Sequence, residues 1–511
     1  MPDLPRDYPT VVHMLLDAAA RAPDREALVC GEDRLSYTEY LRCVAGLAQE
    51  LDERGARGGR VALVMGNSVD ICIASFAVHM AGAQLTPLNP LYTENELGPM
   101  LDDADVSVLI HDDAVSTRVA GLIRRLSIEQ VIAVGGPDGR RLTEWRAGAD
   151  LTPPQPLPLA ESPGTLQFTG GTTGRSKGAD LSHRALAINI SQREALVPNR
   201  PDVERMLCVM PLFHCYASHM CLHAMAYARG ALVVMPRYHP DEVIRLLHDE
   251  CITLLGAAPT LLTGLLNYPA FTGQRFPLLT RTYSGSAPLP EEVIHRWESL
   301  TGTIVIEGYG QSEAGPVISF NPVAGPRKAG SVGVAVPDED LQIVDMESGN
   351  RVLPAGQQGE IRIRGPHLMS GYRNRPDETA GVLRDGWLYT GDIGELDDDR
   401  YLFIRGRKKE MIIVSGYNVF PREVEEVLHA HPNVREAAVV GRPDDYRGEL
   451  PVAFVAARAG ADLSAVELTR HCAGSLAPYK VPAAFNIVAE LPKTAVGKVD
   501  KLALAARVRL T

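Results

Sequence analysis

The 511-residue sequence has no basic excess, few cysteines and no long apolar run, and each of these shortages excludes a class of protein. A formal net charge of −12 argues against a general nucleic-acid binder. The eight cysteines are scattered and form no C-x-x-C pair, so a reducing cytoplasm fits better than an oxidising compartment. The first ten residues carry two acidic residues and three prolines, unlike a signal peptide.

No stretch of the sequence is long and apolar enough for a transmembrane helix. The longest apolar run, residues 71–85, is interrupted by His79 and Gln84, and therefore predicts a buried helix. We expect a cytoplasmic protein, either a homodimer or a monomer, that binds no nucleic acid; peripheral contact with a membrane remains open.

Apolar residues make up 45% of the chain and charged residues 22%, which is typical of a large globular protein. Short β-branched runs alternate with helical stretches, first between residues 61 and 136 and again between residues 206 and 310. This rhythm predicts an α/β fold with two mostly parallel subdomains, residues 1–165 and 166–327.

The sequence pattern changes after residue 327. Short strands separated by turns predict a β-rich subdomain over residues 328–405, which completes a large N-terminal domain of residues 1–405. A last α/β alternation predicts a small, mobile α+β C-terminal domain over residues 411–511. The segment GRKKE, residues 406–410, is the expected hinge between the two domains.

The segment FTGGTTGRSKG, residues 168–178, concentrates glycines, hydroxyls and two cations. Glycines let backbone N–H groups approach an anion, and Thr and Lys side chains add donors, so a phosphate ligand is expected. The spacing departs from the Walker pattern because Lys177 follows Gly174 by three residues and precedes Gly178. By composition alone a plain flexible loop stays possible.

Five further segments accompany this loop, in the order EGYGQSE (307–313), YTGDIG (389–394), GRKKEMIIVSGYNVFPREVE (406–425), GRPDDYRGE (441–449) and PKTAVGK (492–498). With them, nearly the whole chain resembles the adenylate-forming superfamily of acyl-CoA synthetases, luciferases and peptide-synthetase adenylation domains. It is most similar to bacterial fatty acyl-CoA ligases. The resemblance implies that ATP and Mg²⁺ activate a carboxylic acid to acyl-AMP with release of pyrophosphate, and that CoA then accepts the acyl group.

The resemblance also assigns roles to residues. It implies that Lys498, Glu313, Thr173 and His214 are catalytic, and that Glu313 and Thr173 contact Mg²⁺. Asp392 and Arg407 would hold the ribose and Tyr309 would stack on adenine. The implied ATP and AMP site comprises Thr169, Gly170, Gly171, Thr172, Thr173, Gly174, Lys177, Ser286, Ala287, Glu307, Gly308, Tyr309, Gly310, Gln311, Ser312, Asp392, Ile404, Arg407 and Lys498.

In this family the C-terminal domain rotates between the two steps, and Lys409 falls at the hinge position. After the rotation, Ser415, Gly416, Tyr417, Arg442 and Arg447 would line the CoA channel. The segment 441–454 contains no lysine for the CoA phosphates, so an amine or a carrier-protein thiol remains an alternative acceptor. A non-catalytic scaffold on the same fold is the remaining rival.

The implied acyl pocket is mostly small or apolar, with no fixed cation for a second carboxylate, which favours a medium- or long-chain fatty acid or a hydrophobic aryl acid. The histidines of residues 214–223 could suggest a metal site, but their apolar helical surroundings favour a pocket wall. The pocket residues are His214, Tyr216, His219, Ala258, Pro259, Tyr283, Ser284, Gly285, Ser286, Ala287, Gln311 and Gly315.

Overall fold

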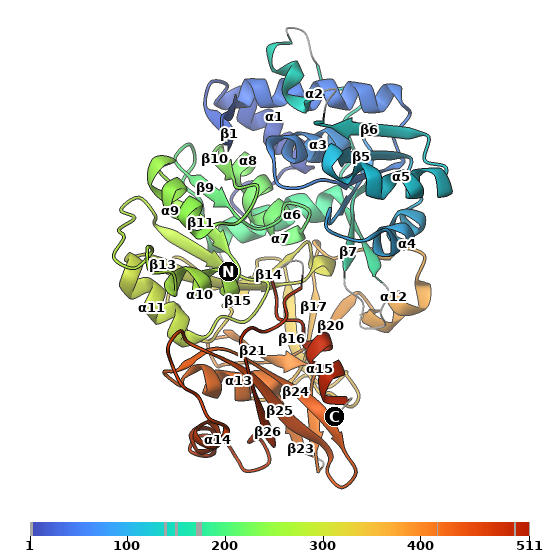
Figure 1. The fold of residues 1–511 in the computed structure, drawn as a ribbon. Coiled ribbons are helices and arrows are strands. Elements are labelled where there is room, and N and C mark those ends of the chain that lie inside the picture. Colours follow the sequence, from blue (N-terminus) through green and yellow to red (C-terminus); the bar gives the residue numbers. More distant parts are fainter. Residues whose placement is uncertain are drawn as a thin grey trace.

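The computed structural model describes residues 4–136, 140–148, 152–169, 176–415, 417–494 and 497–509. Four sheets organise these residues (Figure 1). Two large, mostly parallel sheets and a β-rich sheet form the N-terminal domain, and a fourth sheet belongs to a small C-terminal domain. The predicted α/β class and this order of parts are confirmed.

The first large sheet has seven strands, and parallel pairing joins β4, β3, β5 and β6 at its centre. Antiparallel strands β8 and β18 close one edge. In spatial order the strands are β18 (Gly371–Tyr372), β8 (Lys177–Ser182), β7 (Pro163–Thr169), β4 (Gln84–Leu88), β3 (Arg60–Val64), β5 (Val108–Asp112) and β6 (Gln130–Val134).

The second large sheet has nine strands, and two of them, β1 and β2 at one edge, come from the N-terminal part of the chain. In spatial order they are β15 (Val334–Ala335), β14 (Val317–Phe320), β13 (Ile304–Gly310), β12 (Arg281–Ser284), β11 (Leu254–Ala257), β9 (Arg205–Cys208), β10 (Ala231–Val234), β1 (Glu26–Cys30) and β2 (Asp33–Ser36). The sheets therefore do not divide at residues 165/166, since β1 and β2 join the later strands and β8 and β18 join the earlier ones.

The helices of the N-terminal domain cover the two large sheets. They are α1 (Val11–Arg21), α2 (Tyr37–Glu53), α3 (Val69–Met80), α4 (Glu94–Ala104), α5 (Ser116–Arg125), α6 (His183–Leu196), α7 (Cys215–Ala217), α8 (Ala224–Ala228), α9 (Pro240–Asp249), α10 (Pro259–Leu266), α11 (Glu291–Thr301) and α12 (Pro376–Val382). Every residue of α3 is buried, as the apolar run predicts, because a helix that is apolar on all sides must be covered on all sides.

The β-rich part consists of β16 (Asp340–Val344), β17 (Gly359–Arg364), β20 (Trp387–Leu396), β19 (Leu383–Arg384) and β21 (Leu402–Arg407). The C-terminal sheet comprises β23 (Tyr417–Val419), β22 (Ile412–Val414), β25 (Gly448–Ala457), β24 (Val434–Asp444) and β26 (Ala484–Val488). Helices α13 (Pro421–His429), α14 (Ala465–Ala473) and α15 (Lys501–Arg509) pack on this last sheet.

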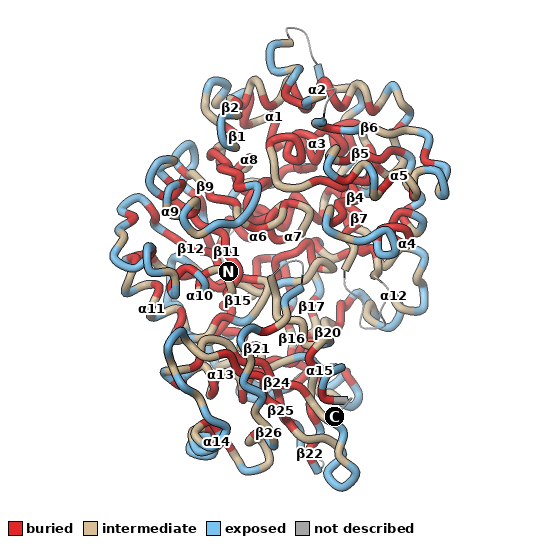
Figure 2. Tube along the Cα trace, in the orientation of Figure 1, coloured by how far each residue is buried: buried red, intermediate tan, exposed pale blue. Residues whose placement is uncertain are grey.

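The C-terminal domain has a core of its own, built on Val424 and Leu428 of α13 and on Val439 and Val455 of the central strands. Figure 2 shows buried segments concentrated inside each domain and exposed loops around them. A separate core allows the small domain to move as a unit, which fits the predicted mobile domain. In the part of the chain that the structure describes, no helix is long and apolar enough to span a bilayer.

Candidate active site

The glycine-rich loop connects β7 to β8, an antiparallel pair in which Thr169 lies opposite Lys177. Gly170, Gly171, Thr172, Thr173 and Gly174 lie outside the described residues. The Lys177 ammonium forms an ion pair with Glu378 of α12 and lies 5.1 Å from the centre of the Tyr372 ring. The lysine of this segment is therefore anchored at the start of β8.

Asp392 on β20 gathers three of the predicted nucleotide residues around one buried carboxylate. Its Oδ2 accepts from the Tyr309 hydroxyl at 2.6 Å and from Gln311 Nε2 at 2.7 Å, while Oδ1 lies 3.1 Å from Arg407 Nε. Burial raises the pKa of Asp392, and the Arg407 guanidinium counteracts this effect. The result is a fixed acceptor, which is the chemistry that binding a pair of ribose hydroxyls requires.

The strand that carries Tyr309 makes room for a close backbone crossing. A Cβ atom at Gly310 would lie 2.0 Å from the Pro316 carbonyl oxygen, so only glycine fits there. Gly308 meets the Phe320 ring in the same way, and Ile404 lies on neighbouring β21, which pairs with β20. These contacts hold the EGYGQSE segment in a sharp turn that points Gln311 at Asp392.

Glu313 follows this turn, and its carboxylate is held by a residue that the sequence analysis missed. The Tyr372 hydroxyl donates to Glu313 Oε1 at 2.7 Å, and Met369 N donates to the Glu313 carbonyl at 2.9 Å. Nothing in the local sequence marks Tyr372, because β18 brings it to this place from the far edge of the first sheet. A single oriented carboxylate fits Mg²⁺, which keeps water and phosphate oxygens as its other ligands.

His214 caps the short helix α7, and its Nδ1 accepts from Tyr216 N at 3.2 Å. Burial, with a smaller contribution from the Lys498 ammonium, lowers the pKa of His214 to about 3. The imidazole is therefore neutral, with its proton on Nε2. Cys215 Sγ lies 3.3 Å from Ser312 Oγ and so connects this segment to the turn before Glu313.

The helix expected after His214 is partly a π-helix, Ser218–His223, between α7 and α8. A run that is apolar on most sides does not distinguish the two helix periods, so nothing in the sequence indicates the π-helix. His219 and His223 are buried within it, and burial lowers the pKa of both. Within the described ranges no group of three or more His, Cys, Asp or Glu side chains could hold a metal ion.

Lys498 comes to this site from the C-terminal domain. Its backbone is held by Thr494, which bonds to it in both directions, and neighbouring Gly497 lies against Thr260 of α10. Burial lowers the pKa of Lys498, whereas Cys215 and Asp392 act to raise it. The ammonium is therefore buried where it interacts electrostatically with residues of the N-terminal half of the site.

The predicted acyl residues lie at the carboxyl ends of β11 and β12 and on the helical segment after His214. Ala258 and Pro259 begin α10, and Ser284 ends β12. The Tyr283 ring packs in the core, 4.9 Å from the Arg193 guanidinium. Gly285, Ser286 and Ala287 form the following loop, in which Ser286 has a φ of 71°, and Gly315 has a φ of 80°.

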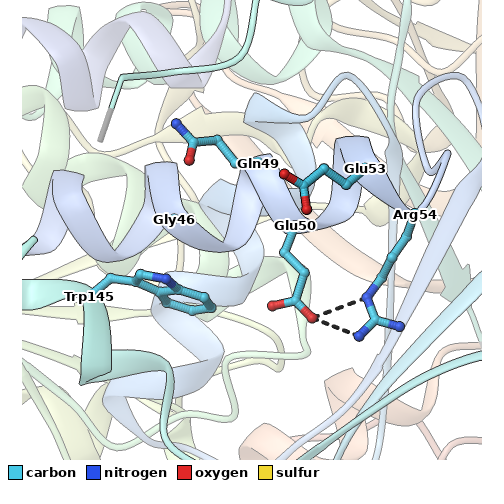
Figure 3. A pocket seen from close by; sticks show the side chains of 6 residues that line it. All are labelled: Gly46, Gln49, Glu50, Glu53, Arg54 and Trp145. Carbon is cyan, nitrogen blue, oxygen red and sulfur yellow. Dashed lines mark hydrogen bonds and ion pairs between the residues drawn. The ribbon is translucent and has the colours of Figure 1, made fainter. Parts of the chain in front are cut away.

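A shallow surface pocket of about 560 Å³ lies elsewhere, on α2 (Figure 3). Its lining residues are Gly46, Gln49, Glu50, Glu53, Arg54 and Trp145. Glu50 is paired with Arg54 at 2.7 Å, and none of the motif residues borders the pocket. The pocket therefore lies apart from the residues that the motifs predict for the active site.

Comparison with known proteins agrees with this arrangement. The family model described as AMP-binding enzyme matches residues 15–373, and the model for the AMP-binding enzyme C-terminal domain matches residues 423–498. The chain belongs to the AMP-binding enzyme family. It is an AMP-forming acid–thiol ligase, as the resemblance predicted.

Relatives of this ligase are similar over almost its whole length. The long-chain-fatty-acid–CoA ligase of Bacillus subtilis is 35% identical, over 97% of this chain and 95% of its own. The 4-coumarate–CoA ligase 5 of Oryza sativa subsp. japonica is 34% identical, over 95% and 92%. The crystal structure of ATP-bound MatB from Rhodopseudomonas palustris has a TM-score of 0.90 and 32% identity, over 98% and 99%.

The ligase's predicted CoA residues are gathered at one end of the C-terminal domain, and the structure does not bring them to Lys498. Ser415 N donates to the Arg447 carbonyl at 2.7 Å, and Arg442 lies on the same hairpin. The exposed Tyr417 ring stacks on Tyr479 at 4.7 Å, and Gly416 lies outside the described residues. Figure 1 shows β23 at the end remote from the N-terminal domain.

The interface between the domains is polar. Arg458 Nη2, just after β25, lies 3.1 Å from both carboxylate oxygens of Glu292 on α11. Glu307 is buried nearby, and burial raises its pKa to about 7 despite the opposing Arg422 of α13. Lys409 is the second residue after β21. The predicted nucleotide residue Glu307 thus faces the C-terminal domain.

Proposed function

We propose that this ligase uses ATP and Mg²⁺ to convert a hydrophobic carboxylic acid, fatty or aryl, to its acyl-AMP and then transfers the acyl group to CoA. One observation carries the proposal: the buried Lys498 ammonium of the C-terminal domain acts electrostatically on His214 and Cys215 of the N-terminal domain, and Asp392 acts on it in turn. This is the arrangement that the first step needs, with a mobile cation between the acid's carboxylate and the α-phosphate.

The residues divide the work by charge and position. Asp392 and Arg407 would hold the ribose, and Glu313, oriented by Tyr372, would offer one oxygen to Mg²⁺. His214 is neutral and donates from Nε2 at the carboxylate end of the acid. Lys498 would neutralise charge that develops between carboxylate and phosphate, so catalysis rests on alignment and electrostatics.

The second step would use the other face of the C-terminal domain. Strand β23, which carries Tyr417, lies at the end of the C-terminal domain remote from the N-terminal domain, so a change of domain orientation is needed to bring it to the acyl group. A rotation about residues 406–410 would exchange the two faces. Arg442 and Arg447 supply the cations that CoA phosphates need in a segment without lysine.

The test is product analysis by mass spectrometry. The enzyme is incubated with ATP, Mg²⁺, a panel of fatty and aryl acids, and either CoA or simple amines. Acyl-CoA and AMP are the expected products. An amide without thioester would assign the acceptor to the amine class, and no consumption of ATP with any acid would overturn the proposal.

A further inference from the structure

Tyr216 is a residue of the proposed acyl pocket, and its ring packs against the carboxyl ends of β11 and β12. The side chain is 8% exposed and lies against two glycines at the ends of neighbouring strands. A Cβ atom at Gly285 would lie 3.0 Å from Tyr216 Cε2, and one at Gly256 would lie 3.6 Å from Cε1. The absence of a side chain at Gly285 leaves room for the ring, whereas a Cβ atom at Gly256 would be in ordinary van der Waals contact with it.

A hydrogen bond fixes the ring in that space. The Tyr216 hydroxyl donates to the Tyr283 carbonyl at 3.0 Å. Because Tyr283 belongs to β12, which pairs with β11, the ring is fastened across the ends of two core strands. Moving it aside would leave a buried hydroxyl and a buried carbonyl without this bond, so the ring acts as a fixed wall.

The protein around the adjoining Tyr283 ring is polar. The Tyr283 ring lies 4.9 Å from the guanidinium of Arg193, which forms an ion pair with Glu194, and both charged side chains are buried. The Arg193 charge also acts on Tyr216 and His219. An alkyl tail that passed Tyr216 would press against a buried ion pair and offer no polar group in return, which is unfavourable.

We propose that Tyr216 sets the length limit of the acid, so that single-ring aryl acids and short aliphatic acids are adenylated in preference to long-chain fatty acids. This inference rests on the proposed function and narrows its substrate class. Sequence similarity does not distinguish between these classes of acid. The relatives named for long-chain fatty acids and for 4-coumarate are 35% and 34% identical to the chain.

The experiment measures pyrophosphate release with a ladder of straight-chain acids from butanoate to hexadecanoate, together with benzoate and cinnamate. The quantity compared is the ratio of kcat/KM for hexadecanoate to that for cinnamate, because a ratio cancels any loss of folded enzyme. The wild-type ratio should be well below one. In Tyr216→Ala and Tyr216→Leu it should rise about tenfold or more, as added methylene groups find room.

Two further variants separate the ring from other effects. Tyr216→Phe keeps the ring but loses the hydrogen bond that fixes it, so its ratio should lie between those of the wild type and Tyr216→Ala. Tyr227→Ala truncates a tyrosine on neighbouring α8, whose hydroxyl bonds to Arg6, and should leave the ratio unchanged. A wild type that prefers hexadecanoate, or folded Tyr216 variants with an unchanged ratio, would overturn the inference. Failure to adenylate any acid would instead overturn the proposed function.

Discussion

The Tyr309 hydroxyl donates a 2.6 Å hydrogen bond to Asp392 Oδ2, and this bond joins the EGYGQSE and YTGDIG segments into one site. Gln311 donates to the same oxygen, and Arg407 faces the other. The carboxylate is therefore held in position by the protein itself. Because this acceptor is already ordered, ligand binding has little conformational entropy to remove from it.

Replacement of Asp392 by Asn should weaken ATP use. A charge-assisted hydrogen bond is worth about 1.5–3 kcal/mol, so kcat/KM for ATP should fall roughly 10- to 150-fold. ATP–pyrophosphate exchange measures this directly. Asp397→Asn is the matched control, because Asp397 pairs with Lys328 away from the site. An unchanged KM for ATP in Asp392→Asn would remove this carboxylate from the nucleotide site.

Lys498→Ala should separate the two half-reactions. The ammonium lies among Cys215 and Asp392 in the present domain orientation, so its loss should reduce acyl-AMP formation severely. Thioester formation from supplied acyl-AMP should be largely preserved, because that step would use the other face of the domain. Lys493→Ala, which removes a lysine paired with Glu436, is the control. Equal losses in both steps would argue against domain rotation.

The pair of Glu292 and Arg458 should favour the orientation that delivers Lys498. Both side chains are partly exposed, and such pairs contribute about 0.2–1 kcal/mol, so Glu292→Arg or Arg458→Glu alone should slow adenylation roughly 1.4- to fivefold. The double reversal should restore the rate, and added salt should shrink the single-variant effects. The measurement is the adenylation rate of the four enzymes at low and high salt.

A matched reversal controls for general effects of charge. Glu423 and Lys480 pair within the C-terminal domain, so reversing them should leave adenylation unchanged. If the two interface variants are impaired by the same factor in transfer from supplied acyl-AMP, the pair acts on stability and not on orientation. A double variant that is no better than the singles would have the same meaning.

The sequence predicted what depends on local pattern. The alternation of apolar and helical runs predicted the α/β parts. The six sequence segments predicted Asp392, Lys498 and the residues around them. Pairings across the fold had no such pattern: Tyr372 reaches Glu313 through an edge strand, and Arg458 meets Glu292 across the domain interface. These contacts depend on tertiary packing, which no hydrophobic period specifies.

The same limit explains Glu307. Its place in EGYGQSE predicts a nucleotide contact, yet its carboxylate faces Arg422 and Glu426 of α13 and Glu291 of α11. The alternation along β13 turns Tyr309 and Glu307 to the same side of the strand, but only the docked C-terminal domain determines what covers Glu307. Because the docked C-terminal domain buries the Glu307 carboxylate, the protonation of this group depends on domain packing.

Stability should therefore depend on pH through Glu307. Burial raises its pKa from 4.5 to about 7, so between these values the folded enzyme holds a proton that the unfolded chain has lost. Stability from this group is complete below about pH 4.5 and falls as pH rises through 7, by about 3 kcal/mol at most. Glu307→Gln mimics the protonated form at every pH and should not lose this stability. The measurement is thermal unfolding of both proteins from pH 5 to 8. The stability of Glu307→Gln relative to the wild type should increase with pH. Parallel curves would show instead that Glu307 is ionised over this whole range and paired with Arg422.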